Sequence, residues 1–188
     1  MENFYRYWVY GGFLAGFVFL ALMPLLATAW GVVMAAVFVQ LPIYMLHQGE
    51  EHFGDRFRLF VNDVMAGGRE ALTPLAVFVI NIVGVWGVDL VAIYLAAYVS
   101  IGWGLIAVDL ALVNALAHIA GAFAKRRYNP GLITAVVLFL PVGIAAYAII
   151  GIQRGTTAMH HIVALLFAIA IHASIIVYVR MRLRRLEG

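Results

Sequence analysis

Cysteine is absent from this chain of 188 residues, and charged residues make up only 11% of it. The first absence excludes disulfide bonds and metal sites with thiolate ligands. The second argues against an ordinary soluble domain, in which about a quarter of the residues are charged. We expect no nucleic-acid partner, because the formal net charge is only +3 and the basic residues lie beside hydrophobic runs, as topology determinants do.

Hydrophobic residues are abundant instead, at 65% of the chain. A soluble protein cannot hide this much apolar surface, so lipid must solvate most of it. A membrane-spanning helix needs about 20 mainly apolar residues. We therefore predict an all-α polytopic membrane protein, with the whole chain (1–188) forming one bundle of about six transmembrane helices. The predicted spans are 8–28, 30–46, 74–98, 101–123, 130–150 and 158–180.

The distribution of basic residues predicts the orientation. With six spans and both termini on one side, that side carries eleven of the twelve Lys and Arg residues, and only Arg154 lies on the other. Because basic loops stay inside, both termini are expected to be cytoplasmic. The residues on the predicted inner side are Arg6, Arg56, Arg58, Arg69, Lys125, Arg126, Arg127, Arg180, Arg182, Arg184 and Arg185.

The longest predicted connection, 53–73, has apolar residues at helical spacing and polar residues on its other face. This pattern predicts a short interfacial helix on the cytoplasmic surface, ended by Gly67 and Gly68. An ordinary connecting helix packed on the bundle explains the pattern equally well, and the two interpretations are compatible.

The run His47-Gln48-Gly49-Glu50-Glu51-His52 follows the second span directly. On a continued helix, Glu51 lies about 40° from His47 and Glu50 about 60° to its other side, whereas His52 lies about 140° away. One imidazole and two carboxylates therefore share a face, and this ligand set suits zinc, iron or manganese. The alternative is a polar helix end in the headgroup region.

Other spans offer partners at a similar depth. His118 lies roughly 10 Å and His172 roughly 12 Å from the inner ends of their spans, and Asn81 lies at a matching depth in the third span. Asn114 shares a helix face with His118, because the two are four residues apart. A lone histidine within a membrane usually makes an interhelical hydrogen bond, but several at one depth favour a shared site.

Four further ionisable residues lie nearer the outer side. His160 and His161 begin the sixth span, and we interpret them as interfacial residues at a helix start. Asp89 and Asp109 fall at similar depths in a predicted hairpin. They could bond each other, a tyrosine or a histidine, with at least one of them protonated. A proton or ion relay is the functional alternative.

The fifth span opens with Arg127-Tyr128-Asn129-Pro130-Gly131. Asn129 as N-cap and Pro130 at the first helical position would explain this start. The arginine beside the predicted site is a candidate for holding a phosphate or carboxylate of a lipid-like substrate.

Three of these patterns together resemble the HXXEE-domain family of bacterial integral membrane proteins. His47-Gln48-Gly49-Glu50-Glu51 matches the motif that names the family, and Asn114-Ala115-Leu116-Ala117-His118 resembles its Asn-Ala-x-x-His motif. Arg126 to Gly131 approximates its Arg-x-Tyr-x-Pro-Gly motif, so the resemblance moves the arginine assignment from Arg127 to Arg126. It suggests a membrane enzyme in the bacterial inner membrane. His172 lies outside the three motifs.

We predict from this a metal-dependent membrane hydrolase that acts on a lipid or another amphipathic molecule. His47, His118 and one or both of Glu50 and Glu51 would bind a divalent metal, zinc rather than iron, and His172 would complete the shell. A glutamate that does not bind the metal would act as general base. The predicted catalytic residues are Glu50, Glu51, Asn114 and Arg126.

Other functions stay open at this point. A di-iron oxidoreductase of the hydroxylase or desaturase type suits the same residues, but two irons usually need six or more protein ligands. A small transporter or metal carrier, or a haem protein with His118 and His172 as axial ligands, is a non-hydrolytic alternative. The expected partners are membrane lipid and an amphipathic small-molecule substrate, and a homo-oligomer is compatible with the sequence.

Overall fold

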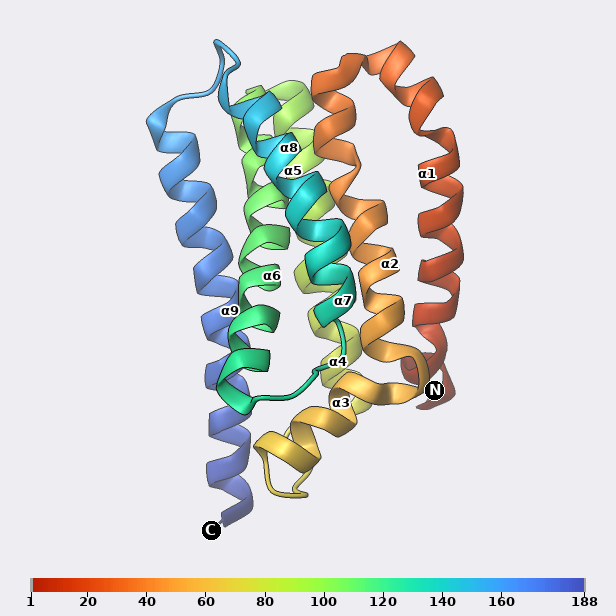
Figure 1. Cartoon of the computed structure of the whole chain (residues 1–188), viewed down its shortest axis with the longest axis vertical. Coiled ribbons are helices and arrows are strands. Elements are labelled where there is room, and N and C mark those ends of the chain that lie inside the picture. Colours follow the sequence, from red (N-terminus) through yellow and green to blue (C-terminus); the bar gives the residue numbers. More distant parts are fainter. Residues whose placement is uncertain (1, 188) are drawn as a thin grey trace.

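The computed structural model describes residues 2–187 and, within that range, the side chains of all residues except 2, 3, 6 and 187. The Arg6 side chain, on which part of the orientation prediction rests, therefore lies outside the described residues. Over residues 2–187 the chain forms helices and turns without a strand (Figure 1). The prediction of an all-α fold is confirmed.

The first two passes form an antiparallel hairpin. Helix α1 (Glu2–Phe38) is broken at Gly31, where φ is 80° and ψ is 161°, and the chain reverses direction at this end of the bundle (Figure 1). Glycine adopts a positive φ without steric cost, which explains the residue at this reversal. The returning limb continues into α2 (Gln40–His52). The second pass thus extends to His52, beyond the predicted limit of 46.

Five stretches among the described residues are long and apolar enough to cross a membrane: Tyr7–Phe38, Pro74–Tyr98, Ile101–Lys125, Leu132–Gly151 and Ala158–Leu186. The first of these contains the reversal at Gly31, and its second limb is completed by α2. Over residues 2–187 the bundle therefore has six passes, which agrees with the prediction of about six helices. Both chain ends lie at the same end of the bundle (Figure 1), which we call the terminal end.

Passes three to six are built from several elements each. The third comprises α4 (Pro74–Asn81), the π-helical η3 (Ile82–Trp86) and α5 (Gly87–Tyr98), and the fourth comprises η4 (Ile101–Gly104) and α6 (Leu105–Lys125). The fifth comprises α7 (Leu132–Thr134), the π-helical η5 (Ala135–Phe139) and α8 (Leu140–Gly151). The sixth is α9 (Ala158–Glu187).

A short helical segment lies across the terminal end of the bundle (Figure 1). It consists of η1 (Phe53–Asp55), α3 (Arg56–Phe60) and η2 (Val61–Met65). Val61 is buried with Leu72 and with Val77 of α4, whereas Met65, which the sequence pattern places on the same apolar face, is 56% exposed and the polar Asn62 is buried. The predicted helical segment is confirmed and packs on the bundle, but its apolar and polar residues do not separate into two faces as the pattern predicts.

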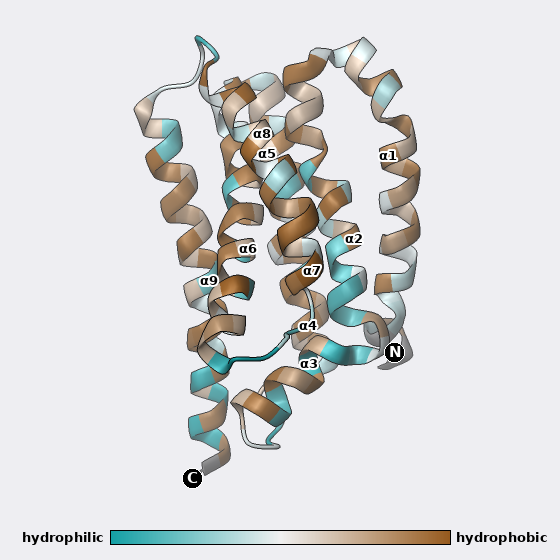
Figure 2. Ribbon diagram, in the orientation of Figure 1, coloured by the Kyte–Doolittle hydropathy of each residue, from teal (hydrophilic) through white to brown (hydrophobic). Residues whose placement is uncertain are grey.

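Small side chains allow the passes to approach each other closely. Ala92, Ala107, Ala146 and Ala164 are almost completely buried between helices, in keeping with the small residues that line helix contacts in membranes. Figure 2 shows apolar residues along most of the passes and hydrophilic residues concentrated toward the terminal end, on α2, on the loop after α6 and on α9. Polar groups that can form a site therefore gather at this end.

Candidate metal centre

Three buried side chains from two helices meet at the terminal end. His47 and Glu51 lie on one face of α2 because they are four residues apart, and His118 faces them from α6. Their exposed fractions are 0%, 5% and 6%. The structure thus brings together three of the five residues predicted as metal ligands.

Glu51 lies between the two imidazoles. Its Oε1 is 3.1 Å from His118 Nε2, and its Oε2 is 3.5 Å from His47 Nε2. Ligand atoms about 2.0–2.2 Å from a tetrahedral zinc ion lie roughly 3.3–3.6 Å from one another. One ligand atom from each of the three residues lies within 4.8 Å of the other two. The group therefore has the dimensions of a three-ligand metal centre.

Thr134 determines which nitrogen of His47 carries the proton. The Thr134 hydroxyl lies 2.5 Å from Glu50 Oε2 and 2.7 Å from His47 Nδ1. A carboxylate only accepts hydrogen bonds, so the single hydroxyl proton goes to Glu50 and the hydroxyl oxygen accepts from His47 Nδ1–H. The lone pair of a neutral His47 is then on Nε2, which faces Glu51 and has no hydrogen-bond partner within the described part of the chain.

Asn129 has the same effect on His118. Its side-chain oxygen lies 2.6 Å from His118 Nδ1, and its amide nitrogen donates to the His118 carbonyl oxygen. The amide oxygen only accepts, so His118 donates through Nδ1 and a neutral His118 keeps its lone pair on Nε2. The prediction that Asn129 caps the fifth span is wrong. Helix α7 begins at Leu132, two residues later than that prediction, and the Asn129 side chain binds His118 instead.

This arrangement can hold a cation. The Nε2 lone pairs of two neutral imidazoles and the oxygens of an ionised Glu51 would face one another across 3.1–3.5 Å in a buried space. Such lone pairs repel each other unless a positive charge lies between them. A proton on one imidazole supplies that charge for one contact, and a metal ion supplies it for all three ligands. Ligating histidines commonly donate through their other nitrogen to a fixed acceptor, as His47 and His118 do.

Gly131 closes the group on one side. Its φ is 101°, and a Cβ atom at this position would lie 2.5 Å from His118 Cε1 and 2.9 Å from His47 Cε1. Real Cβ atoms essentially never approach another atom so closely. The backbone of the loop after α6 is therefore in contact with both imidazole rings, and only glycine leaves room for them.

Glu50 supports the centre and does not join it. Its oxygens accept hydrogen bonds from the Thr134 hydroxyl and amide, from the Ile133 amide and from the Tyr128 hydroxyl. Burial, followed by the hydrogen bond to Glu50 and its charge, raises the pKa of Tyr128 to about 12. Glu50 thus ties the start of α7 to α2.

His52 lies nearer to the centre than its helical angle predicts. Its Nε2 is 3.4 Å from Glu51 Oε2, and neither of its ring nitrogens has a hydrogen-bond partner in the part of the chain that the structure describes. The helical pattern ends at this residue, where φ is −114°. His52 thus contacts Glu51 but, in line with its predicted angle, is not part of the three-residue group.

Three other predicted site residues lie around the group. His172 Nδ1 donates to the Ala168 carbonyl oxygen, 2.8 Å away on its own helix, and His172 is not part of the three-residue group. Asn114 donates to the Tyr44 hydroxyl, and no described residue is a hydrogen-bond partner of its buried side-chain oxygen. Arg126 is exposed and lines a groove beside the group.

The predicted outer residues lie far along the helices from this centre. His160 Nδ1 accepts from the Thr157 amide at the start of α9, and His161 Nδ1 lies 2.6 Å from the Tyr147 hydroxyl. The interpretation of both as residues of a helix start agrees with these contacts. Asp89 and Asp109 are buried, and neither oxygen of Asp89 has a hydrogen-bond partner among the described residues, so Asp89 bonds neither Asp109 nor the tyrosine or histidine that the sequence left open.

Comparison with known protein families identifies a match that covers these residues. The model of a family described as proteins of unknown function with an HXXEE motif matches residues 38–146. This chain belongs to the HXXEE family. The matched range contains all three residues of the candidate metal centre and also Asn129, Gly131 and Thr134, whereas His172 lies outside it. No curated protein and no solved structure matches the chain.

Sequence reasoning missed two residues of this HXXEE protein that the centre depends on. Thr134 is a single hydroxyl residue in the first turns of an otherwise apolar span, and that isolation was a usable signal. Gly131 carried no signal of contact with the histidines, because such a contact depends on how the loop folds against α2 and α6.

Proposed function

We propose that this HXXEE protein is a metal-dependent membrane hydrolase whose single zinc ion is held by His47, Glu51 and His118. Its substrate is an ester of a lipid or of another amphipathic molecule, reached from the terminal end of the bundle. The observation that carries the proposal is the convergence of two Nε2 atoms and one carboxylate in a buried space, with each imidazole oriented by an acceptor at Nδ1.

Three protein ligands suit a catalytic zinc ion. Catalytic zinc sites typically have three protein ligands and a fourth position for water, and the metal lowers the pKa of that water to about 7. In the overall reaction, the water oxygen joins the acyl carbon or phosphorus atom and the ester bond breaks. The water hydrogen ends on the leaving oxygen, so the products are an acid and an alcohol.

The neighbouring residues have supporting roles in this proposal. Glu50 holds Thr134, and Thr134 holds the His47 ring, so we assign Glu50 a positioning role rather than that of general base. The unpartnered oxygen of Asn114, one helical turn before His118, is available to accept a hydrogen bond from the substrate or from water.

Elemental analysis of the purified protein in detergent tests the metal. We expect about one zinc per wild-type chain and less than a tenth of that in His47→Ala, Glu51→Gln and His118→Ala. His172→Ala is the matched control, because it removes an imidazole of the same bundle that is not part of the group, and it should retain the zinc. Wild-type protein without any transition metal, or full zinc in all variants, would overturn the proposal.

A second candidate is a di-iron oxidoreductase. The specific observation that favours it is His52, which lies on the other side of Glu51 Oε2 with both nitrogens unpartnered. Glu51 would then bridge two irons. Against it, both Glu50 oxygens are engaged with Thr134, Ile133 and Tyr128, so few ligands remain for a second metal. Two irons per chain, lost in His52→Ala, would favour this candidate over the hydrolase.

A further inference from the structure

A groove of about 570 Å³ runs along the outside of the bundle between the end of α6 and the start of the fifth pass. Its walls are apolar, with Ile119 and Phe123 on α6 opposite Leu132, Val136 and Leu140. From Leu132 to Leu140 the helical rise is roughly 12 Å, which is a considerable part of the length of an acyl chain.

One end of the groove is polar and basic. Arg126, Arg127 and Tyr128 line it there, where α6 ends and the loop to α7 begins. Arg126 and Arg127 are both exposed, and Arg127 also lies over the Phe60 ring at 5.4 Å. Two guanidinium groups beside an apolar channel complement a molecule that has a phosphate at one end and a hydrocarbon chain at the other.

The basic end adjoins the candidate metal centre. Tyr128, which lines the groove, donates a hydrogen bond of 2.7 Å to Glu50, and Leu132 follows Gly131, which contacts both histidine rings. A headgroup held at this end would therefore lie on the loop that covers His47 and His118.

We propose that this groove binds an anionic phospholipid, with its phosphate at Arg126 and Arg127 and an acyl chain along α6 and η5. The further statement that this phospholipid is the substrate ester of the metal centre rests on the proposed function. The binding site itself stands on the charge and shape of the groove alone.

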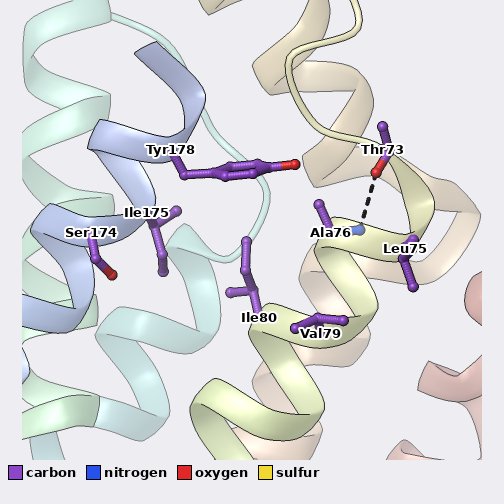
Figure 3. A pocket seen from close by; sticks show the side chains of 8 residues that line it. All are labelled: Thr73, Leu75, Ala76, Val79, Ile80, Ser174, Ile175 and Tyr178. Carbon is purple, nitrogen blue, oxygen red and sulfur yellow. Dashed lines mark hydrogen bonds between the residues drawn. The ribbon is translucent and has the colours of Figure 1, made fainter. Parts of the chain in front are cut away.

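A second groove supplies the control. It has a volume of about 370 Å³ and lies between α4 and α9, lined by Val79, Ile80 and Ile175 with Thr73 and Tyr178 (Figure 3). The Thr73 hydroxyl is already an acceptor for the Ala76 amide, and no arginine lines this groove. Val79 and Val136 have the same exposed fraction, 45%, so one substitution can be made equally in both grooves.

The test measures binding of dioleoyl phosphatidylglycerol and dioleoyl phosphatidylcholine to the delipidated full chain by native mass spectrometry. We expect wild type to bind the anionic lipid about tenfold more tightly than the zwitterionic one. The double variant Arg126→Gln/Arg127→Gln should lose about this factor, since two charge-assisted contacts are removed. The tail variant Arg184→Gln/Arg185→Gln removes the same charge elsewhere and should stay within about twofold of wild type.

Variants that block the groove distinguish lipid binding in the groove from lipid contact elsewhere on the bundle surface. Val136→Trp should weaken phosphatidylglycerol binding about tenfold, whereas the control Val79→Trp should not change it. Phe123→Ala removes only an exposed side chain of the groove, so it should weaken phosphatidylglycerol binding without straining the fold. Equal binding of the two lipids by wild type, or equal loss from both tryptophan variants, overturns the inference. Zinc content is measured on the same samples. Lipid selectivity in a protein that contains no zinc would contradict only the hydrolase proposal. Zinc in a protein that shows no lipid selectivity would contradict only the proposal that the groove binds an anionic phospholipid.

Discussion

At the scale of single residues, the centre depends on atoms that hold its ligands as much as on the ligands themselves. Thr134 and Asn129 each accept a hydrogen bond from the Nδ1 atom of one histidine, and Gly131 leaves the space that both rings occupy. The motif His47 to Glu51 therefore contains two kinds of acidic residue. Glu51 faces the histidines, whereas Glu50 holds the loop that orients one of them.

Replacing Thr134 with valine should weaken metal binding without removing a ligand. Valine has a similar shape but cannot accept from His47 Nδ1–H, and losing such a supporting contact typically costs about 10–100-fold in metal affinity. Competition with a fluorescent zinc chelator measures this loss. Thr134→Ser keeps the hydroxyl and should stay near wild type, and equal affinities for the valine and serine variants would contradict the role assigned to the hydroxyl.

Gly131→Ala should abolish metal binding. Its new methyl group would overlap His118 Cε1 and also meet His47, so at least one ring must leave its position. Gly121→Ala is the matched control, because its methyl group would lie 3.5 Å from the Asn129 side-chain nitrogen, which is an ordinary contact. Full zinc content in Gly131→Ala would show that the loop does not pack on the histidines as described.

At the scale of elements, the site is positioned by close packing of α1 on α2. Gly49 occupies one of the two variable positions of the HXXEE motif, and its Cα lies against the Phe13 ring of α1. Gln48, at the other, donates to Asn81 on α4 and accepts from Trp86 of η3. The variable positions thus fix the rotation of α2, and this rotation points His47 and Glu51 toward α6.

Gly49→Ala should destabilise the protein. A Cβ atom at Gly49 would lie 2.4 Å from Phe13 Cδ2, and overpacking of this kind costs about 1–3 kcal/mol. Thermal unfolding in detergent, followed by circular dichroism, should show a lower Tm. Gly11→Ala, in the same helix pair, meets nothing within 4 Å and should leave Tm unchanged or slightly higher. The prediction fails if the two variants have the same Tm. In a Phe13→Ala background, which lacks the clashing ring, Gly49→Ala should lower Tm less than it does in the wild type.

At the scale of the whole molecule, both termini and the segment of η1, α3 and η2 lie at one end of the bundle (Figure 1). The candidate centre lies at the same end, because Glu51 is two residues before η1 begins. The sequence places eleven of the twelve basic residues on this side and Arg154 on the other. We therefore expect the terminal end to face the cytoplasm. A substrate would then approach the centre from the inner leaflet.

Single cysteines test this orientation directly, because the natural chain has none. We expect a membrane-impermeant maleimide, added to intact cells, to label Arg154→Cys. Arg184→Cys, also an exposed arginine, should be labelled only after the membrane is permeabilised. The reverse labelling pattern would place the termini and the candidate centre outside.

The number and order of the passes followed from the sequence, since long apolar runs have no stable alternative to helices in lipid. The pairing of His47 with Glu51 followed as well, because helical spacing alone places residues four apart on one face. The candidate partner His118 was found from its depth, which needs only the rise per residue and the end of the span. These inferences all depend on geometry along a single helix.

Only the tertiary structure decided how one helix faces another and how the irregular segments fold. Depth alone could not separate His118 from His172, because depth does not specify rotation about the helix axis. The turn at His52, the late start of α7 and the path of Gly131 between two histidines depend on nonlocal packing that leaves no periodic trace in the sequence. The sequence therefore determined which passes exist and which residues share a face. The contacts among α2, α6 and the loop before α7 decided which of those residues form a centre.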